Sequence, residues 1–331
     1  MEAQILVNDA FMQTSFLKKY ARSFLRRNAK FFSRLLLKKE KYIAPVIPED
    51  FYARIEITNA CNYNCKYCPH SNMKRPLGIM DEALYRKIID ECLAGGIRMI
   101  NLTSFGESML DKNLLSKIKY AKDKGTSYLY LTTNGSLMDA RRAEELIDVG
   151  LDEVRVSIDA VSSSEYSQVR SEYNYNSVVK NITRLIEIKK EKKAVNPKIT
   201  VCFIKRQDNK HQVDDFVNTW KDKVDVIHIQ TFHNWAAGIA GGVAGNFVPC
   251  KRLWLTLNVY WDGTVGLCCA DIDGKCIVGD FKTSTLEEIW NSGEFQDARK
   301  KNLKNDQDFI CARCSLPERD SLLWIKKVLT G

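Results

Sequence analysis

The chain of 331 residues lacks the marks of a membrane or secreted protein. It has no run of about eighteen uninterrupted apolar residues, the length that a membrane-spanning helix requires. Its N-terminus has neither the short apolar core nor the small-residue cleavage site of a secretory signal. We therefore expect a cytoplasmic protein.

The chain also has little basic surplus outside its first part. The net charge is +9, but residues 1–44 hold ten Lys and Arg against three Asp and Glu, which leaves a surplus of two for the rest. A nucleic-acid-binding protein normally carries a basic stripe on its folded domain, and no such stripe follows residue 44. We expect no nucleic-acid partner.

Disulfides do not explain the cysteines. The eleven cysteines are odd in number, so they cannot all pair, and several stand in C-x-x-C-like groups. That clustering favours metal binding in a reducing compartment over disulfide bonds. The four histidines, in contrast, form no zinc-protease pattern.

Residues 11–41 are predicted to form one amphipathic helix, because aromatic and basic residues recur at helical spacing on nearly opposite faces. Such a helix could lie on an anionic membrane surface or dock an acidic partner; alternatively it is an arm packed on the protein itself, with solvated cations. Prolines 45 and 48 then end the helix. The aromatic and apolar ridge is Phe16, Tyr20, Phe24, Phe32 and Leu36, and the basic ridge is Lys18, Arg22, Arg26, Lys30, Arg34 and Lys38.

Between residues 53 and 231 the pattern alternates strand and helix six times, which predicts a parallel sheet. Parallel strands with helical crossovers close into a full or partial barrel or form a doubly wound open sheet, and the alternation alone does not choose. The predicted strands are 54–58, 97–103, 126–132, 153–158, 198–204 and 225–231. The predicted helices are 81–94, 112–124, 139–149, 175–193 and 211–220.

The last part of the chain changes character. Residues 236–245 are rich in glycine and small residues and are expected to form a loop, since they lack the lysine of a phosphate-binding loop. A hairpin is predicted from 254–260 to 264–268, with Gly263 in its turn, and helices at 285–291, 294–302 and 320–329. The resulting domains are a basic extension (1–48), an α/β barrel (49–234) and a small α+β domain (235–331).

Three cysteines carry the first metal site. Cys61, Cys65 and Cys68 have the spacing C-x-x-x-C-x-x-C on a loop that leaves the C-terminal end of the first barrel strand. Three thiolates leave one coordination position open to a ligand from outside the protein, whereas structural sites normally take four protein ligands. The C-terminal ends of strands are also where α/β proteins keep their active sites.

This spacing, with the aromatic Tyr67 before the third cysteine, resembles that of the radical S-adenosylmethionine (SAM) enzymes. The resemblance implies a partial (β/α)6 barrel and a 4Fe-4S cluster on Cys61, Cys65 and Cys68, with SAM chelating the fourth iron.

The resemblance also implies the residues that hold SAM, all at strand ends. The segment 104–107 is similar to the family's Gly-Gly-Glu motif, with Phe105 in place of the first glycine. Arg170 resembles the arginine that pairs with the methionine carboxylate, which suits a guanidinium fork. The resemblance implies that Glu107 accepts from the methionine ammonium, that Ser157 and Asp159 bind the ribose hydroxyls, and that the Tyr67 ring packs by the adenine or shields the cluster. The full set of expected cofactor contacts is Tyr67, Gly106, Glu107, Thr132, Asn134, Ser157, Asp159 and Arg170.

A second site has four cysteines: Cys250, Cys268, Cys311 and Cys314. Their pattern permits a structural zinc site, since a hairpin with C-x-x-C is common in zinc ribbons. It also resembles the SPASM or twitch extension of radical SAM enzymes, which implies an auxiliary 4Fe-4S cluster. No cysteine follows Cys314, so one auxiliary cluster is expected rather than two. Cys269 is expected to point to the face of a strand opposite Cys268, and Cys276 follows a predicted turn at 273–274, so both are expected to be non-ligands.

Taken together, the resemblance implies a radical SAM oxidoreductase. Such an enzyme cleaves SAM reductively to a 5′-deoxyadenosyl radical, which abstracts hydrogen from the substrate, and needs a flavodoxin- or ferredoxin-type electron donor. With the auxiliary cluster as electron acceptor, we expect a two-electron oxidation of an alcohol on a sugar or aminocyclitol. Two alternatives remain open: radical maturation of a ribosomal peptide, and a non-catalytic zinc-stabilised protein. No residue is singled out as a catalytic acid or base.

Overall fold

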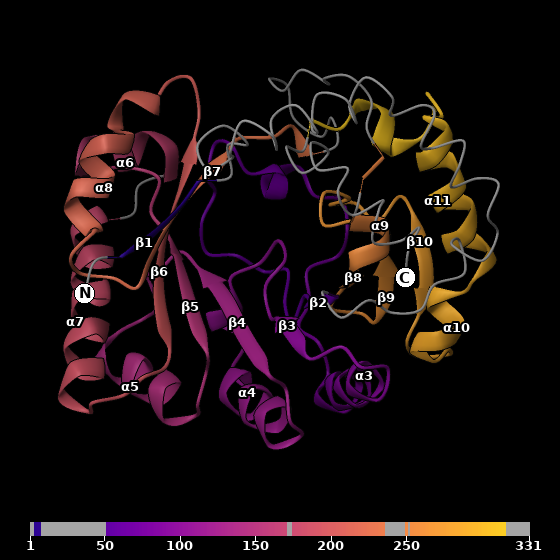
Figure 1. The fold of residues 1–331 in the computed structure, drawn as a ribbon, viewed down its shortest axis with the longest axis horizontal. Helices are drawn as coiled ribbons and strands as arrows, with labels where there is room; N and C mark the ends of the chain where they lie inside the picture. The colour runs from indigo at the N-terminus through magenta and orange to yellow at the C-terminus, as the bar shows by residue number, and fades with distance from the viewer. Residues whose placement is uncertain (1–2, 8–50, 171–173, 236–248, 251, 316–331) are drawn as a thin grey trace, which may run out of the picture.

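The computed structural model describes residues 3–7, 51–170, 174–235, 249–250 and 252–315. The predicted N-terminal helix 11–41, the glycine-rich segment 236–245 and the predicted helix 320–329 lie outside these ranges. Figure 1 shows one curved sheet with helices along its outer side.

Six parallel strands form the barrel part of the sheet, in the order of the sequence from β2 to β7. Every neighbouring pair is parallel, from Tyr52 opposite Met99 to Lys205 opposite Thr231. This is the partial barrel that the sequence predicts, rather than a doubly wound sheet. The strands are β2 (Tyr52–Ile55), β3 (Met99–Asn101), β4 (Tyr128–Thr133), β5 (Glu153–Ser157), β6 (Lys198–Lys205) and β7 (Val226–Thr231).

Helices cover one face of these strands. Alternate strand residues such as Ala53, Ile55 and Ile100 are fully buried against them, whereas Arg54 is half-buried on the other face. Asp81, Asp139 and Asn174 cap the helices that follow them through their side chains, which is why α3, α5 and α7 begin where they do. The helices are α3 (Glu82–Ala94), α4 (Leu114–Asp123), α5 (Ala140–Asp148), α6 (Ser163–Arg170), α7 (Tyr175–Glu191) and α8 (Val213–Trp220).

Two elements of this part were not predicted. Strand β1 (Gln4–Val7) pairs in parallel with β7 and extends the sheet at its far edge. Helix α6 buries only Tyr166 and Arg170, so its mostly polar sequence has no clear apolar stripe. Both elements are short, and the sheet and the barrel mouth give them the partners that fix them.

The C-terminal part continues the same sheet. Strand β8 (Thr256–Val259) pairs in parallel with β2, and β9 (Thr264–Gly266) and β10 (Ile277–Asp280) follow antiparallel. Gly263 has φ +90° in the β8–β9 turn, so the predicted hairpin and the glycine in it are confirmed. Figure 1 shows helices α9 (Arg252–Leu255), α10 (Leu286–Trp290) and α11 (Gly293–Lys304) in this part.

The limits of the predicted hairpin were wrong at both ends. Residues 254 and 255 belong to the helical turn α9, and the Thr256 hydroxyl donates to the Arg252 carbonyl at 2.8 Å to close that turn. At the other end β9 stops at Gly266, so Cys268 lies on a loop and not in a strand.

Candidate active site

The three-cysteine loop leaves the C-terminal end of β2, as predicted. Cys61, Cys65 and Cys68 are all half-buried. The loop is held locally, because the Cys68 amide donates to the Cys65 carbonyl at 3.0 Å and the Lys66 amide donates to the Val169 carbonyl at 3.0 Å. It therefore has a defined conformation against α6.

The surroundings of these sulfur atoms fit an iron–sulfur cluster. The Tyr63 amide lies 3.4 Å from Cys61 Sγ and Arg170 Nη1 lies 3.9 Å from Cys65 Sγ, and such donors stabilise thiolate ligands. Burial raises the pKa of the Cys61 thiol to about 12 and that of Cys68 to about 11. In the described residues no three His, Cys, Asp or Glu side chains are arranged to hold a single metal ion. An iron–sulfur cluster of four irons is wider than a single ion, so its cysteine ligands stand farther apart than those of a single-ion site.

Gly106 and Glu107 support the loop from β3. A Cβ atom on Gly106 would lie 2.2 Å from the Thr58 carbonyl oxygen, so only glycine fits beside the start of the loop. The Glu107 amide donates to the Ala60 carbonyl at 2.8 Å. Phe105, which replaces a glycine of the family motif, is buried and lies 5.7 Å from the Trp235 ring, centroid to centroid.

The Glu107 carboxylate is buried and already has partners. It accepts from the Asn134 amide at 2.7 Å, the Thr133 hydroxyl at 2.9 Å and the Met109 amide at 3.1 Å. Burial raises its pKa, and these bonds oppose the rise. The expected role of Glu107 in binding the SAM ammonium remains a prediction, and the structure adds that Glu107 joins the ends of β3 and β4.

Asn134 contacts the cysteine loop directly. Its Nδ2 donates to Asn62 Oδ1 at 2.9 Å, and Asn62 Nδ2 donates to Ser136 Oγ at 2.9 Å. Sequence reasoning missed Asn62 and Ser136, since a polar residue between two cysteines gives no signal of its partner. In contrast, the backbone amide of Thr132 donates to the Thr103 hydroxyl, which in turn donates to the Thr132 carbonyl. In the described part of the chain, these hydrogen bonds do not connect Thr132 to a cysteine.

Asp159, Arg170 and Tyr67 form a cluster beside Cys65. Both Arg170 Nη2 and the Tyr67 hydroxyl donate to Asp159 Oδ2, and the Ile204 amide donates to Asp159 Oδ1 at 2.6 Å. Asp159 adopts a left-handed backbone conformation with φ +61°. Ser157 lies half-buried two residues before it, at the end of β5. The structure therefore brings three of the expected SAM residues together, and gives the Tyr67 hydroxyl a partner that the sequence did not predict.

Arg170 retains an unused donor. Burial lowers the pKa of Arg170, whereas the negative charge of Asp159 raises it. The resulting pKa of Arg170 lies well above its usual value. Its Nε is buried and has no hydrogen-bond partner in the described part of the chain. A buried guanidinium with an unused donor, next to the three-cysteine loop, is suited to bind an anionic ligand.

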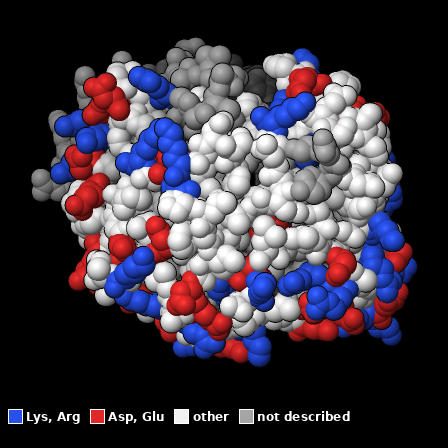
Figure 2. Space-filling view, turned by 180° about the vertical axis from the view of Figure 1, so that it is seen from behind, with Lys and Arg blue, Asp and Glu red and all other residues white. Residues whose placement is uncertain are grey.

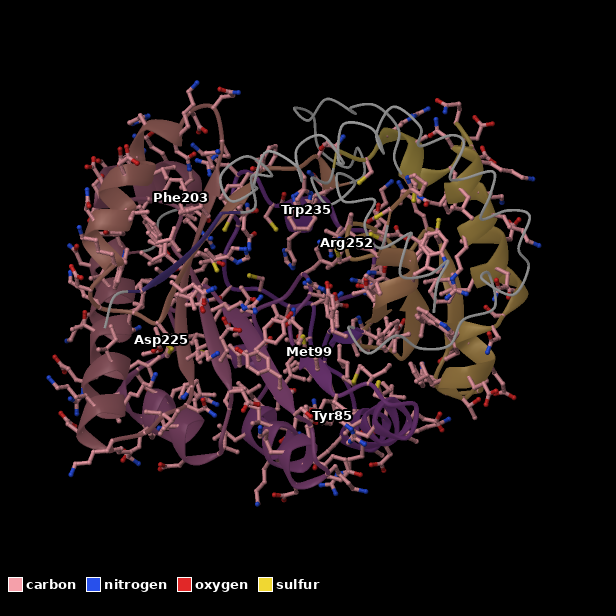
Figure 3. The ribbon with its side chains drawn as sticks, viewed as in Figure 1. Tyr85, Met99, Phe203, Asp225, Trp235 and Arg252 are labelled. Carbon is pink, nitrogen blue, oxygen red and sulfur yellow. The ribbon has the colours of Figure 1, made fainter. Side chains whose placement is uncertain are left out.

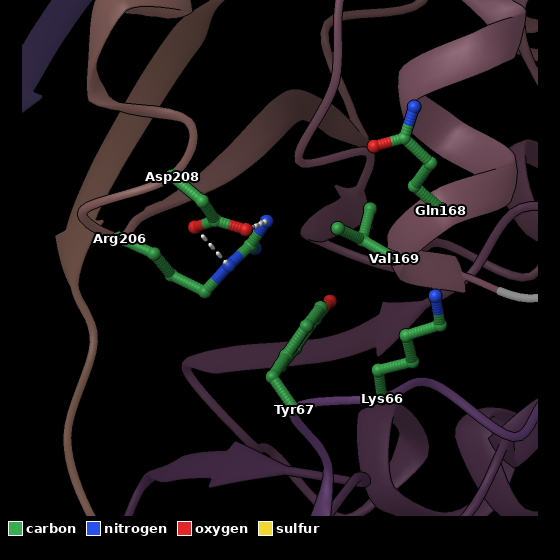
Figure 4. A pocket seen from close by; sticks show the side chains of 6 residues that line it. All are labelled: Lys66, Tyr67, Gln168, Val169, Arg206 and Asp208. Atoms are coloured by element: carbon green, nitrogen blue, oxygen red, sulfur yellow. Dashed lines mark hydrogen bonds and ion pairs between the residues drawn. The ribbon is translucent and has the colours of Figure 1, made fainter. Parts of the chain in front are cut away.

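A pocket of about 370 Å³ opens next to the side chains of Asp159, Arg170 and Tyr67 (Figure 4). Tyr67 forms its floor, the Arg206 guanidinium carbon lies 5.0 Å from the Tyr67 ring centroid, and Arg206 pairs with Asp208 at 3.0 Å. The other lining residues are Lys66, Gln168 and Val169.

The four predicted auxiliary ligands are all buried in the C-terminal part. The Ala270 amide lies 3.4 Å from Cys268 Sγ, and Cys250 is close enough to Cys268 to raise its pKa. Cys311 belongs to the 3-10 helix Ile310–Arg313, and the Cys314 amide donates to the Cys311 carbonyl at 3.3 Å. Their joint ligation of one cluster remains a prediction.

Cys269 differs from the expectation that it points away from Cys268. The Cys269 thiol interacts with the Cys268 thiol, and this interaction, aided by Arg252, lowers the pKa of Cys269 well below the usual value. Arg252 Nη1 lies 3.1 Å from Cys269 Sγ. The expectation of opposite faces was wrong because the residues lie on a loop.

The segment after the cysteine loop joins the two cysteine sites. Arg75 forms two bonds with the Glu56 carboxylate, at 2.8 and 2.9 Å, and its Nε donates to the Ile272 carbonyl at 2.7 Å. Glu56 continues from β2, and Ile272 lies four residues after Cys268. Arg75 therefore connects the strand that carries the first site to the loop that carries the second.

Within the described residues, no helix is long and apolar enough to cross a membrane. On the face shown in Figure 2, basic and acidic side chains are intermingled.

Comparison with known solved structures supports the fold. The structure of BtrN with AdoMet and 2-DOIA has a TM-score of 0.56 at 19% identity, covering 80% of this chain and 92% of BtrN. Native anSMEcpe with AdoMet has a TM-score of 0.58 at 15% identity, covering 74% and 81%. Streptococcus suis SuiB with its precursor peptide SuiA has a TM-score of 0.60 at 12% identity, covering 94% and 78%. At these identities the likeness shows the fold alone.

Curated relatives match about half of the chain. A probable GTP 3′,8-cyclase of Methanococcus maripaludis is 35% identical over 136 residues, 41% of this chain and 45% of the relative. The GTP 3′,8-cyclase of Mannheimia succiniciproducens is 30% identical over 181 residues, 53% of this chain and 51% of the relative. The chain thus spans about half the length of the curated relatives it matches.

Two family models match consecutive parts of the chain. Residues 55–218 match the radical SAM superfamily, and residues 250–315 match the iron–sulfur cluster-binding domain named SPASM. The first match contains the three-cysteine loop and its supporting strand ends, and the second contains all four cysteines of the other site. The chain therefore belongs to the radical SAM superfamily and carries a C-terminal SPASM iron–sulfur cluster-binding domain.

Proposed function

We propose that the protein is a radical SAM oxidoreductase with two 4Fe-4S clusters. The two domains imply SAM and 4Fe-4S clusters as cofactors. When bound, these groups would supply reductive SAM cleavage, hydrogen abstraction from substrate and an outlet for a second electron. The observation that carries the proposal is the three-cysteine loop at the end of β2, with Arg170 directed at Cys65 and one of its donors unused.

In this proposal the protein's residues hold SAM rather than react with it. Arg170 binds the methionine carboxylate, and Asp159 fixes Arg170 by accepting from Nη2. Because both Asp159 oxygens already accept from protein donors, Asp159 acts by positioning Arg170 and Tyr67 rather than by binding ribose alone. Ser157 at the end of β5 is left for the ribose hydroxyls.

The pocket beside Tyr67 is our candidate for the nucleoside end of SAM. Its floor is an aromatic ring that belongs to the cysteine loop, and a guanidinium packs against that ring. Flat bases stack well on aromatic rings and on guanidinium planes. The pocket therefore supports our proposal that the Tyr67 ring packs by the adenine.

The substrate that we favour is an alcohol on a sugar or aminocyclitol. A two-electron oxidation uses the auxiliary cluster as electron acceptor, and the four cysteines within 250–315 would build one such cluster. BtrN, a fold neighbour that covers most of this chain, was crystallised with AdoMet and 2-DOIA. A flavodoxin- or ferredoxin-type protein would deliver the first electron.

Peptide maturation is the second candidate. It is favoured by SuiB, whose structure contains a precursor peptide and whose likeness extends over 94% of this chain. Anaerobic incubation with each substrate class, followed by mass spectrometry, separates the two. Loss of two hydrogens from an alcohol supports the first candidate, and a modified peptide supports the second.

The number of clusters has its own test. Replacing Cys311 and Cys314 by alanine should lower the iron content from about eight to about four atoms per chain while leaving SAM cleavage intact. Iron and acid-labile sulfide are measured on anaerobically reconstituted protein. Unchanged iron would exclude an auxiliary cluster on these cysteines.

A further inference from the structure

The inner face of the barrel sheet carries arginines where substrate would bind. On the outer face the strand residues pack against helices and are fully buried, whereas Arg54 on β2 and Arg155 on β5 project from the other face and stay half-buried. The side chain of Arg155 is 27% exposed. Among the residues that the structure describes, no helix lies over this concave side in Figure 1.

Arg54 forms no ion pair with a carboxylate among the residues that the structure describes. Its Nη1 donates to the Thr103 carbonyl at 3.3 Å, and its Nε is buried without a hydrogen-bond partner among the described residues. The ionisable groups with the largest effect on it are Cys269, Tyr52, Tyr130 and Arg252. A buried guanidinium donor without a hydrogen-bond partner favours an anionic ligand.

Arg155 lies on the other side of Tyr130. Its guanidinium carbon is 4.0 Å from the Tyr130 ring centroid, and Nη2 donates to Glu153 at 2.7 Å. Glu153 also accepts from Tyr128 and Thr200, so its charge is shared among three donors. Arg155 Nε, like that of Arg54, is buried and has no hydrogen-bond partner within the described ranges.

A third guanidinium comes from the C-terminal part. Arg252 Nη1 lies 3.3 Å from the Tyr52 hydroxyl, at the start of the strand that carries Arg54. Figure 3 shows Arg252 on the side of the C-terminal part that faces the barrel strands. Three arginines, from β2, β5 and α9, therefore lie near one region of the inner face, and Arg155 pairs there with the Glu153 carboxylate.

We infer that Arg54 and Arg155 bind an anionic group of the substrate, a phosphate or a carboxylate, on the inner face of the barrel. This inference rests on the proposed function, because it names the class of substrate for the same site. An anion would pair with these two guanidinium groups, whose Nε donors have no hydrogen-bond partner among the described residues, and would relieve the repulsion among the arginines. Arg54 lies on β2, before the three-cysteine loop, and Arg155 lies on β5, four residues before Asp159, so both are set back from the barrel mouth. The anionic group therefore lies several bonds from the carbon that loses hydrogen.

The test measures anion binding directly. Anaerobically reconstituted full-length protein is titrated with inorganic pyrophosphate and, separately, with malonate in a calorimeter. We expect saturable binding of at least one probe, and weakening of roughly tenfold or more in Arg155→Gln and Arg54→Gln, as expected for loss of a charge-assisted bond. Pyrophosphate binding alone identifies a phosphate site, and malonate binding alone a carboxylate site.

Two controls keep the inference falsifiable. Arg141→Gln removes an exposed arginine of α5, whose side chain is 74% exposed, and should bind the probes as the wild type does. Arg54→Lys keeps the charge if Arg54→Gln fails to fold, and should retain weak, salt-sensitive binding. No saturable binding by the wild type, or equal binding by a folded Arg155→Gln variant, overturns the inference. SAM cleavage is measured separately, so a failed proposed function would appear as lost cleavage with anion binding unchanged.

Discussion

At the residue scale, the ion pair of Asp159 and Arg170 is the most constrained polar contact beside the cysteine loop. Its side chains are 0% and 7% exposed, so neither charge is solvated by bulk water. Removing one partner of such a pair leaves the other charge buried, which costs far more than the pair contributes at the surface.

Asp159→Asn tests this contact with little change of shape. Asparagine tolerates the left-handed backbone conformation of residue 159, so the substitution removes charge rather than geometry. We expect the free energy of unfolding to fall by roughly 3 kcal/mol and the affinity for SAM to drop, measured by urea unfolding and equilibrium dialysis. Asp123→Asn, which breaks an exposed pair with Lys119, is the control and should cost under about 1 kcal/mol. Equal losses in the two variants would contradict the role given to Asp159.

Gly106 sets how closely the end of β3 approaches the cysteine loop. In Gly106→Ala the new methyl group would meet the Thr58 carbonyl at 2.2 Å, so the loop must move. We expect a lower melting temperature and less iron on Cys61, Cys65 and Cys68, read by calorimetry and iron analysis. Gly293→Ala is the matched control, because a Cβ there has no atom within 4 Å. Full iron occupancy in Gly106→Ala would show that the close approach is not needed.

At the element scale, the sequence predicts the barrel well and its contacts poorly. The six strands of the barrel follow from alternating apolar residues, and Gly263 marks the hairpin turn because a tight turn needs a positive φ. Strand β1 and helix α6 escaped prediction, since their short sequences have no periodicity strong enough to stand alone.

The candidate active site shows the same difference between features that the sequence predicts and contacts that it does not. The cysteine spacing is local and visible in the sequence, whereas the bond between Asn62 and Asn134 joins residues 72 positions apart. Tyr67 was expected to contribute its ring, but its hydroxyl also donates to Asp159, a partner set by how α6 packs beside the loop. Long-range partners of polar loop residues depend on the completed fold, so residue patterns cannot supply them.

Arg75 tests the connection between the two cysteine-bearing elements. Arg75→Met should leave the fully buried Glu56 without its bidentate partner and destabilise the protein by about 3–5 kcal/mol. Arg86→Met, which loses a half-exposed pair within α3, should cost under about 1 kcal/mol. Urea unfolding of both variants measures the difference. Similar free energies of unfolding would mean that Arg75 does not tie β2 to the loop after Cys268.

At the scale of the whole molecule, one sheet carries both cysteine sites. Strand β2 leads into the three-cysteine loop and also pairs with β8, the first strand of the C-terminal part. The barrel and the cluster-binding domain are therefore not two units joined by a free linker. A rigid connection of this kind keeps the distance between two redox groups constant, which suits transfer of an electron from substrate to the second site.

The most direct measurement of the central claim is SAM cleavage by anaerobically reconstituted protein with dithionite. We predict that the wild type and the Cys311→Ala/Cys314→Ala variant form 5′-deoxyadenosine, and that the triple variant Cys61→Ala/Cys65→Ala/Cys68→Ala forms none. Chromatography with mass detection quantifies the product, and metal analysis of the same samples reports iron against zinc. 5′-Deoxyadenosine from the triple variant, or wild-type protein that holds stoichiometric zinc with almost no iron and cleaves no SAM, would contradict the account.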